Sequence, residues 1–102
     1  MSRELRLRPE LLDDVAETFA WYENTATGLG HEFLRSYFAA LSVLTRQPTL
    51  SRKIHRGFRR VLLGRFPYAI YFRLEQKYVV AFLLVHGARD PAAIRITLRE
   101  RK

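Results

Sequence analysis

Over most of the chain, from residue 12 onward, the spacing of the apolar residues changes from a helical period to a period of two. In the first half, apolar residues recur three and four positions apart, as on one side of an amphipathic helix. They form two stripes: Leu12, Val15, Phe19 and Tyr22, and then Phe33, Leu34, Tyr37, Phe38, Leu41 and Leu44. A Gly-containing break at residues 25–30 separates the stripes, and Pro48 follows the second one. Helices joined by so short a loop pack antiparallel, so the sequence predicts a helical hairpin.

Strand-like alternation precedes and follows this hairpin. Leu5 and Leu7 alternate with arginines and predict a short first strand, which ends where Pro9 begins the first helix. Residues 60–63 and 68–75 alternate again, and residues 76–77 leave room for a tight hairpin turn. Residues 78–85 are apolar on both faces, as in a central strand that is covered on both sides.

The predicted order is strand, helix, helix and three strands, which is an α+β fold. We expect a two-layer sandwich in which the helical hairpin packs on an antiparallel sheet, with residues 1–102 forming one domain. The other face of the sheet has no predicted cover, and a bound partner is one candidate. Residues 94–98 alternate, and either a last strand or a helix fits them.

The charge of the chain is divided unequally along its length. The net charge is +8, yet residues 1–32 carry a net charge of −4 and residues 33–102 carry +12. Six cations fall within residues 52–65 without one acid. Such asymmetry attracts polyanions or an acidic protein to one side of a molecule.

Composition excludes several other classes of protein. The chain has no cysteine, which excludes disulfides and thiolate chemistry and fits a reducing cytoplasm. No apolar run reaches membrane-spanning length, so we expect no membrane association. The three histidines lie in separate predicted elements without carboxylates at ligand spacing, so we expect no metal site and no cofactor. His31 is expected to be exposed and His86 to be a structural residue at a strand exit.

Four segments together carry a resemblance to a known family. They are residues 5–10 (Leu-Arg-Leu-Arg-Pro-Glu), 28–34, 65–71 (Arg-Phe-Pro-Tyr-Ala-Ile-Tyr) and 86–91 (His-Gly-Ala-Arg-Asp-Pro). In this order, over nearly the full length, they resemble the ParE branch of the RelE/ParE toxin superfamily. These proteins are the toxins of bacterial plasmid-stabilisation and chromosomal toxin–antitoxin operons. The resemblance implies the RelE/ParE toxin fold and a toxin of a type II toxin–antitoxin system.

The superfamily includes two activities. RelE-like members are ribosome-dependent mRNA endoribonucleases, whereas ParE-like members inhibit DNA gyrase without cleaving RNA. The RelE-like pattern places an arginine at the position of Ala69, which cannot hold a phosphate, and a tyrosine or His-Tyr pair near the end, where residues 98–102 have neither. We therefore expect no catalytic residues and an inhibitor rather than an enzyme.

Two alternatives stay open at this point. One is a RelE-like ribonuclease that uses Arg89 with Arg52, Lys53 and Arg56 as cations. The other is a protein of the same fold that is not toxic and acts only within an antitoxin complex.

The resemblance also implies partners and binding residues. The partners are DNA gyrase and a cognate antitoxin, a ribbon-helix-helix DNA-binding protein with a disordered C-terminal segment, so that DNA is contacted only indirectly, through antitoxin or gyrase. The residues expected to bind the target are Arg59, Arg60, Arg65 and Arg89. The residues expected to bind the antitoxin are Trp21, Arg56, Arg59, Arg65, Phe66, Tyr68 and Arg73.

Overall fold

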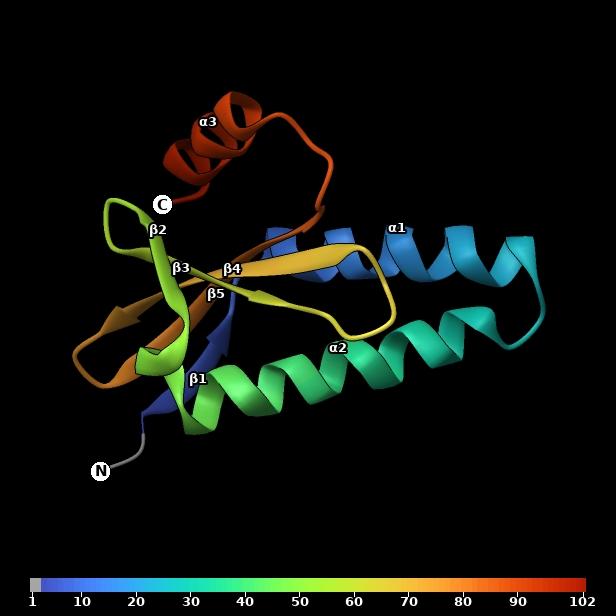
Figure 1. Cartoon of the computed structure of the whole chain (residues 1–102), viewed down its shortest axis with the longest axis horizontal. Helices are drawn as coiled ribbons and strands as arrows, with labels where there is room; N and C mark the ends of the chain where they lie inside the picture. Colours follow the sequence, from blue (N-terminus) through green and yellow to red (C-terminus); the bar gives the residue numbers. More distant parts are fainter. Residues whose placement is uncertain (1–2) are drawn as a thin grey trace.

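A five-stranded sheet with helices on both faces forms the fold of residues 3–102, the part of the chain that the computed structural model describes (Figure 1). Along the chain the elements are β1 (Glu4–Leu7), α1 (Pro9–Thr25), α2 (Leu29–Arg46), the short 3₁₀ helix η1 (Pro48–Leu50), β2 (Arg52–His55), β3 (Phe58–Leu62), β4 (Tyr68–Glu75), β5 (Tyr78–His86) and α3 (Pro91–Arg101). Within residues 3–102, no helix has both the length and the apolar character needed to cross a membrane.

The strands lie in the order β1-β5-β4-β3-β2. From β2 to β5 each strand pairs antiparallel with the next, and the turn at residues 76–77 joins β4 to β5 as predicted. In contrast, β1 pairs parallel with β5, with Glu4 opposite Tyr78. The prediction of a wholly antiparallel sheet is therefore wrong at this edge, and β2 is a strand that the sequence pattern did not indicate. The predicted α+β class, with a helical hairpin on the sheet, is confirmed.

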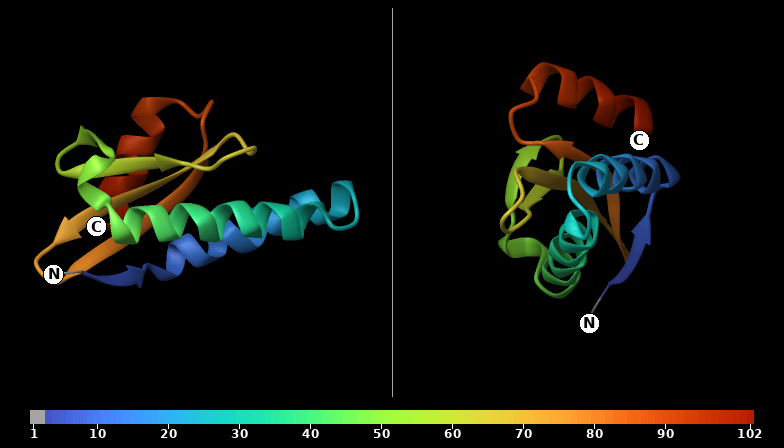
Figure 2. Two further views of the ribbon diagram at one scale, coloured as in Figure 1. Left: turned by 60° about the horizontal axis from the view of Figure 1, so that its bottom comes forward. Right: turned by 90° about the vertical axis from the view of Figure 1, so that its right-hand side faces the viewer.

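The hairpin of α1 and α2 covers the first face of the sheet. Phe33 and Leu44 of α2 are fully buried there against Ile70 and Phe72, which lie on one face of β4 as the alternation predicted. Leu12 was expected in this core but is 50% exposed. The adjacent Leu11 is buried in its place. Figures 1 and 2 show the closed end of the hairpin projecting beyond the sheet.

Two glycines allow the hairpin to close tightly. Gly28 precedes α2 with a φ of +89°, a left-handed conformation that glycine adopts without a steric penalty. Gly30 lies inside α2, where a β-carbon would be 2.8 Å from the carbonyl oxygen of Phe19 on α1. Gly30 therefore permits close contact between the two helices, whereas the sequence placed it in the break between them. The Glu23 carboxylate accepts hydrogen bonds from the N–H groups of Gly28 (2.9 Å) and Gly30 (3.0 Å) and so caps α2.

The last helix, α3, covers part of the second face of the sheet (Figure 2). Ile94 and Leu98 are buried there in a second core that includes Phe82 and Leu83. A β-bulge in β5 directs these two consecutive residues to the same face. The carboxylate of Asp90 accepts a hydrogen bond from the Ala92 N–H in the first turn of α3 and so caps this helix. Residues 94–98, which fitted either a strand or a helix, thus belong to a helix.

Candidate functional site

A groove of about 290 Å³ lies over the second face, between α3 and the β2–β3 hairpin. Four arginines line it, and we call it the basic groove: Arg52 of β2, Arg60 of β3, Arg89 of the β5–α3 loop and Arg95 of α3. Its lining also includes apolar side chains of α3 and the buried Tyr71 of β4, and it includes no Asp or Glu. Pairing of β2 with β3 places Arg52 opposite Arg60, and the packing of α3 on the sheet brings Arg89 and Arg95 to the same groove.

A second hollow of about 190 Å³ continues the basic groove along α3. It shares His55, Arg95 and Leu98 with the first and adds three cations: Arg56, Arg99 and Lys102. Arg56 occupies the turn between β2 and β3 with a φ of +47°, followed by Gly57 at +83°. Two consecutive positive φ values are typical of the tight turns whose twist matches a β-hairpin. This turn places Arg56 at the end of the groove.

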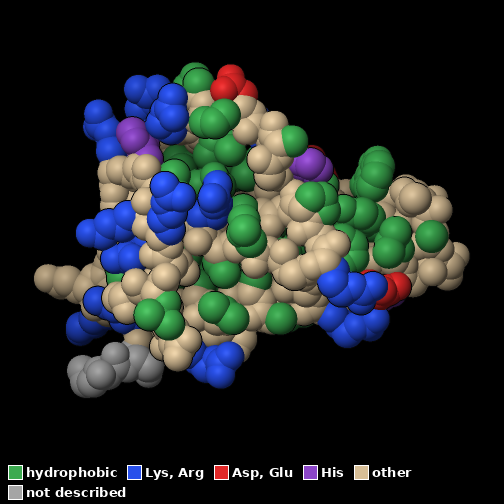
Figure 3. All heavy atoms as spheres, in the orientation of Figure 1, with side chains coloured by type: hydrophobic (Ala, Val, Ile, Leu, Met, Phe, Trp, Pro, Cys, Tyr) green, Lys and Arg blue, Asp and Glu red, His purple; other side chains and the backbone are tan. Residues whose placement is uncertain are grey.

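The arginines of the basic groove have no carboxylate partner within residues 3–102. The ion pairs in this part of the chain join Arg8 to Glu10, Arg65 to Glu32, Arg73 to Glu75 and Arg101 to Asp14. Within the groove, Arg60 has only a long contact of 3.5 Å to the Tyr71 hydroxyl. On the face drawn in Figure 3, Lys and Arg side chains gather at the end that carries the β2–β3 hairpin and α3. The groove is therefore suited to bind anions.

The four residues expected to bind the target lie in three places. Arg60 and Arg89 both line the basic groove. Arg59 donates to the carbonyl oxygens of Thr49 (3.3 Å) and Ser51 (2.8 Å), and so ties the segment before β2 to β3. Arg65 is exposed near α2, where it pairs with Glu32 at 3.0 Å. Adjacent strand residues point to opposite faces, which separates Arg59 from Arg60.

The residues expected to bind the antitoxin are spread more widely, and their roles stay predictions. Trp21 is 62% exposed on α1, and Arg56 is exposed in the β2–β3 turn. Phe66 is buried and Tyr68 half-buried in an aromatic cluster that joins the hairpin to β4. Arg73 lies on the second face, where its guanidinium stacks against two phenylalanine rings at 5.2 and 5.3 Å.

Ala69 also lies on the second face, but it is 2% exposed within the core.

The three histidines differ from one another in environment. His31 is exposed, and the Nδ1 atom of His86 accepts a hydrogen bond from the Ala88 N–H at the end of β5, both as predicted. His55 lines the basic groove, a position that its sequence context did not reveal.

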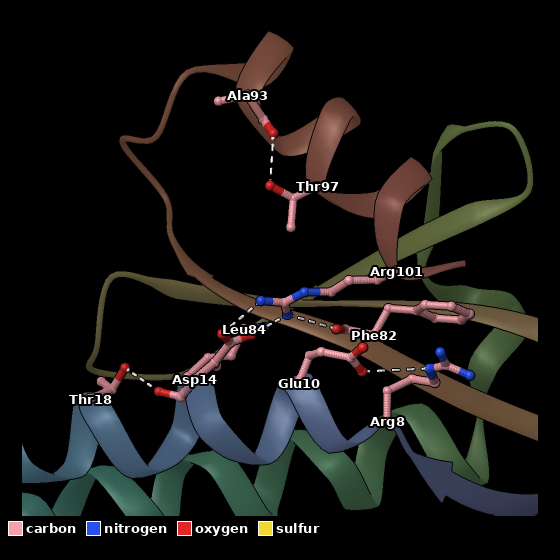
Figure 4. Close-up of polar contacts among 9 residues, drawn as sticks. All are labelled: Arg8, Glu10, Asp14, Thr18, Phe82, Leu84, Ala93, Thr97 and Arg101. Carbon is pink, nitrogen blue, oxygen red and sulfur yellow. Dashed lines mark hydrogen bonds and ion pairs between the residues drawn. The ribbon is translucent and has the colours of Figure 1, made fainter.

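An ion pair between α1 and α3 was also missed from sequence (Figure 4). Arg101 binds both carboxylate oxygens of Asp14, at 2.6 and 3.0 Å, and donates to the carbonyl oxygen of Phe82. The same carboxylate accepts from the Leu84 N–H at 3.1 Å. The hydrogen bonds to Asp14 raise the pKa of Arg101 above its ordinary value. Asp14 therefore ties α3 and β5 to α1.

A second surface that sequence reasoning missed is an apolar groove of about 380 Å³ on the outside of the hairpin. Its residues are Leu7, Leu12, Val15, Ala16, Phe19, Leu34, Tyr37 and Phe38. Phe38 is 59% exposed, and the buried Tyr37 hydroxyl has no hydrogen-bond partner among the described residues. The sequence does contain a signal for this surface, namely adjacent apolar residues at positions 11–12 and 37–38. One buried stripe of a helix uses only one residue of each such pair, so the other residue remains exposed.

Comparison with known proteins identifies the fold through structure. No protein-family model matches the sequence, and no curated protein sequence matches it significantly. A solved chain of the chromosomal ParDE toxin–antitoxin system from P. aeruginosa superposes with a TM-score of 0.73 at 16% sequence identity. The match covers 83% of this chain and 96% of that chain. The chain therefore has the ParE-type toxin fold, as its sequence motifs indicated.

Proposed function

We propose that this chain is the toxin of a type II toxin–antitoxin system, which arrests bacterial growth by binding DNA gyrase and is neutralised by a cognate antitoxin. The observation that carries the proposal is the likeness of fold, over 83% of the chain, to a chain from a ParDE system. The sequence motifs independently resemble the ParE branch of the superfamily.

The basic groove is the surface that we assign to the target, with Arg60 and Arg89 at its centre. Both are expected to contact the target, both lie in the groove, and neither has an acidic partner in the described part of the chain. Inhibition by binding needs no general acid or base. The buried Ala69 leaves the strand position used by RelE-like ribonucleases without a phosphate-binding side chain.

A supercoiling assay with purified gyrase tests this proposal. The chain is expected to inhibit supercoiling and to accumulate the cleaved DNA complex at stoichiometric excess. Arg60→Gln with Arg89→Gln should weaken inhibition, whereas Arg35→Gln with Arg46→Gln, an equal charge change at exposed positions of α2, should not. Absence of inhibition by the unaltered chain would reject gyrase as the target.

For the antitoxin we propose the apolar groove on the hairpin, with charge pairs on the sheet. A segment that folds on binding gains most of its affinity by burying apolar surface, and exposed Leu12 and Phe38 offer such a surface. The buried Phe66 and the half-buried Tyr68 pack against Tyr22 of this hairpin and would support it indirectly.

The protein encoded by the adjacent reading frame is the probe for this surface. Co-expression with a tagged toxin should yield a complex that Phe38→Asp disrupts. Val43→Asp is the matched control, because Val43 is an exposed apolar residue of the same helix outside the groove. Equal loss of the complex in both variants would argue against this placement.

One observation favours a second candidate, the ribosome-dependent ribonuclease. His55, Arg60, Tyr71 and Arg89 all line the basic groove, and His and Arg together can activate a 2′-hydroxyl and hold a phosphate. Primer extension on translated mRNA after induction distinguishes the two activities, since codon-positioned cuts occur only with the ribonuclease.

The remaining alternative is a protein of this fold that is not toxic and acts only within an antitoxin complex. In that case, induction of the chain without its antitoxin would leave bacterial growth unchanged.

A further inference from the structure

The apolar groove on the outside of the hairpin faces solvent when the chain is alone. Leu12 and Phe38 are 50% and 59% exposed there, and Ala16 between them is also exposed. A contiguous apolar strip on the surface of a protein usually marks a place where another molecule binds. The antitoxin that we assign to this groove covers it only within the complex.

Charged residues of opposite sign border the two sides of this groove. On α1, Asp13 and Glu17 are exposed, and Asp13 lies one turn from the groove residue Ala16. On α2, the exposed Arg35 lies one turn from the groove residue Phe38. These three charged side chains belong to no ion pair within residues 3–102. The groove thus has an acidic rim on α1 and a basic rim on α2.

The antiparallel hairpin holds the two rims at the same level. The close approach of Gly30 to the Phe19 carbonyl oxygen, where a β-carbon would lie 2.8 Å away, fixes the register of the two helices. Both helices rise about 1.5 Å per residue. Five residues beyond Gly30, Arg35 is therefore level with the turn of α1 between Asp13 and Glu17. The opposite charges lie on either side of the groove at one height.

We propose that, without antitoxin, this groove is covered by the same groove of a second copy of the chain. A two-fold axis parallel to the helices lays α1 of each copy over α2 of the other. The acidic rim of one copy then meets the basic rim of its partner twice, and Leu12 and Phe38 of both copies are buried between the two hairpins. A two-fold axis across the helices would place acid over acid, so the charges select the first arrangement.

The basic groove on the second face lacks this self-complementarity. Its described lining holds four arginines and no Asp or Glu, so two copies repel each other there. The hairpin groove instead combines both signs of charge with an apolar floor. The dimer also gives a role to the acids of α1, which the basic groove does not use.

This inference rests on the proposed function in one respect, the assignment of the hairpin groove to the antitoxin. It adds a form of regulation, because dimerisation and antitoxin binding both cover Leu12 and Phe38 and so exclude each other. The two ideas fail separately, since the oligomeric state is measured without antitoxin. If Phe38→Asp separated the dimer but left the antitoxin complex intact, the dimer would stand and the antitoxin placement would be rejected.

Sedimentation equilibrium of the purified chain without antitoxin measures its mass as a function of concentration. We expect a dimer that dissociates on dilution. Phe38→Asp should give a monomer, because the substitution places a charge in the apolar centre of the interface. Val43→Asp should remain dimeric, because Val43 is an exposed apolar residue of the same helix outside the groove. Circular dichroism confirms that each variant is folded before masses are compared.

Charge reversal tests the orientation of the two copies. Asp13→Arg alone and Arg35→Asp alone should each raise the dissociation constant of the dimer about tenfold, because like charges then face each other. The double variant, and an equimolar mixture of the two single variants, restore opposite charges at both contacts and should restore the dimer. Arg46→Asp, the same charge change outside the groove, should have little effect. The two single variants change net charge in opposite directions, so net charge alone does not explain weakening by both.

Three results would overturn the proposal. A monomer at every concentration would leave the groove to the antitoxin alone. A dimer that Phe38→Asp and Val43→Asp affect equally would form through another surface. A dimer that the paired charge reversals fail to restore would contradict the two-fold axis parallel to the helices.

Discussion

Replacing Arg101 with glutamine should detach the end of α3 from α1 and β5. The substitution removes the bidentate pair with Asp14, at 2.6 and 3.0 Å, and the 3.0 Å bond to the Phe82 carbonyl. Hydrogen bonds that involve a charged group contribute about 1.5–3 kcal/mol each, but desolvation of the two charges offsets part of this gain. The side chains are 19% and 16% exposed, so solvent screens the pair only partly. We expect the free energy of unfolding to fall by about 2 kcal/mol.

Urea denaturation followed by far-ultraviolet circular dichroism measures this loss. For a domain of this size, 2 kcal/mol corresponds to a fall in Tm of about 8–16 °C. Arg99→Gln is the matched control, because Arg99 is an exposed arginine of the same helix without an ion pair among the described residues. Its effect should stay within about 0.5 kcal/mol.

A double-mutant cycle with Asp14→Ala isolates the pair itself. Coupling of about 1–2 kcal/mol is expected for a partly buried bidentate contact. If Arg101→Gln and Arg99→Gln were equally stable and the cycle showed no coupling, the ion pair would have no role in holding α3. The cover of the second face would then depend on the apolar contacts of α3 alone.

Three further predictions concern local structure. Gly30→Ala should cost about 1–3 kcal/mol of stability because its β-carbon would lie 2.8 Å from the Phe19 carbonyl oxygen, whereas Gly64→Ala, with nothing within 4 Å, should be nearly neutral in the same denaturation assay. The backbone hydrogen bonds from Gly28 and Gly30 lower the pKa of Glu23. The stability that the Glu23 carboxylate adds relative to Glu23→Gln should therefore be complete above its ordinary pKa of 4.5 and disappear as the pH falls through the lower pKa of the folded state. Thermal unfolding of both proteins across pH measures this difference. Asp90→Ala should lower stability by about 1 kcal/mol through loss of the helix cap, and Asp90→Asn should retain most of it.

Sequence patterns predicted the local elements well, because each depends on residues close together in the chain. The helical period placed α1 and α2, and alternation placed β4 with Ile70 and Phe72 toward the hairpin. Motif order indicated the fold, which the structural comparison confirmed.

The site depended on contacts that no local pattern encodes. Because successive residues of a strand point to opposite faces, the alternation predicts that Arg59 and Arg60 lie on different faces of the sheet. It does not show which of these arginines lines a groove, because that depends on where α3 packs. Residues 94–98 fitted either a strand or a helix, so the covering of the second face by α3 was not predicted.

The sequence by itself determined the helical hairpin, the alternating strands, the net positive charge and the family resemblance, because these follow from composition and spacing along the chain. Only the tertiary structure decided that β1 runs parallel to β5, that Asp14 binds a residue 87 positions away, and that four arginines without acidic partners meet beneath α3. Packing between distant segments sets strand direction and charge proximity, and it is this packing that turns a basic sequence into a groove for an anion.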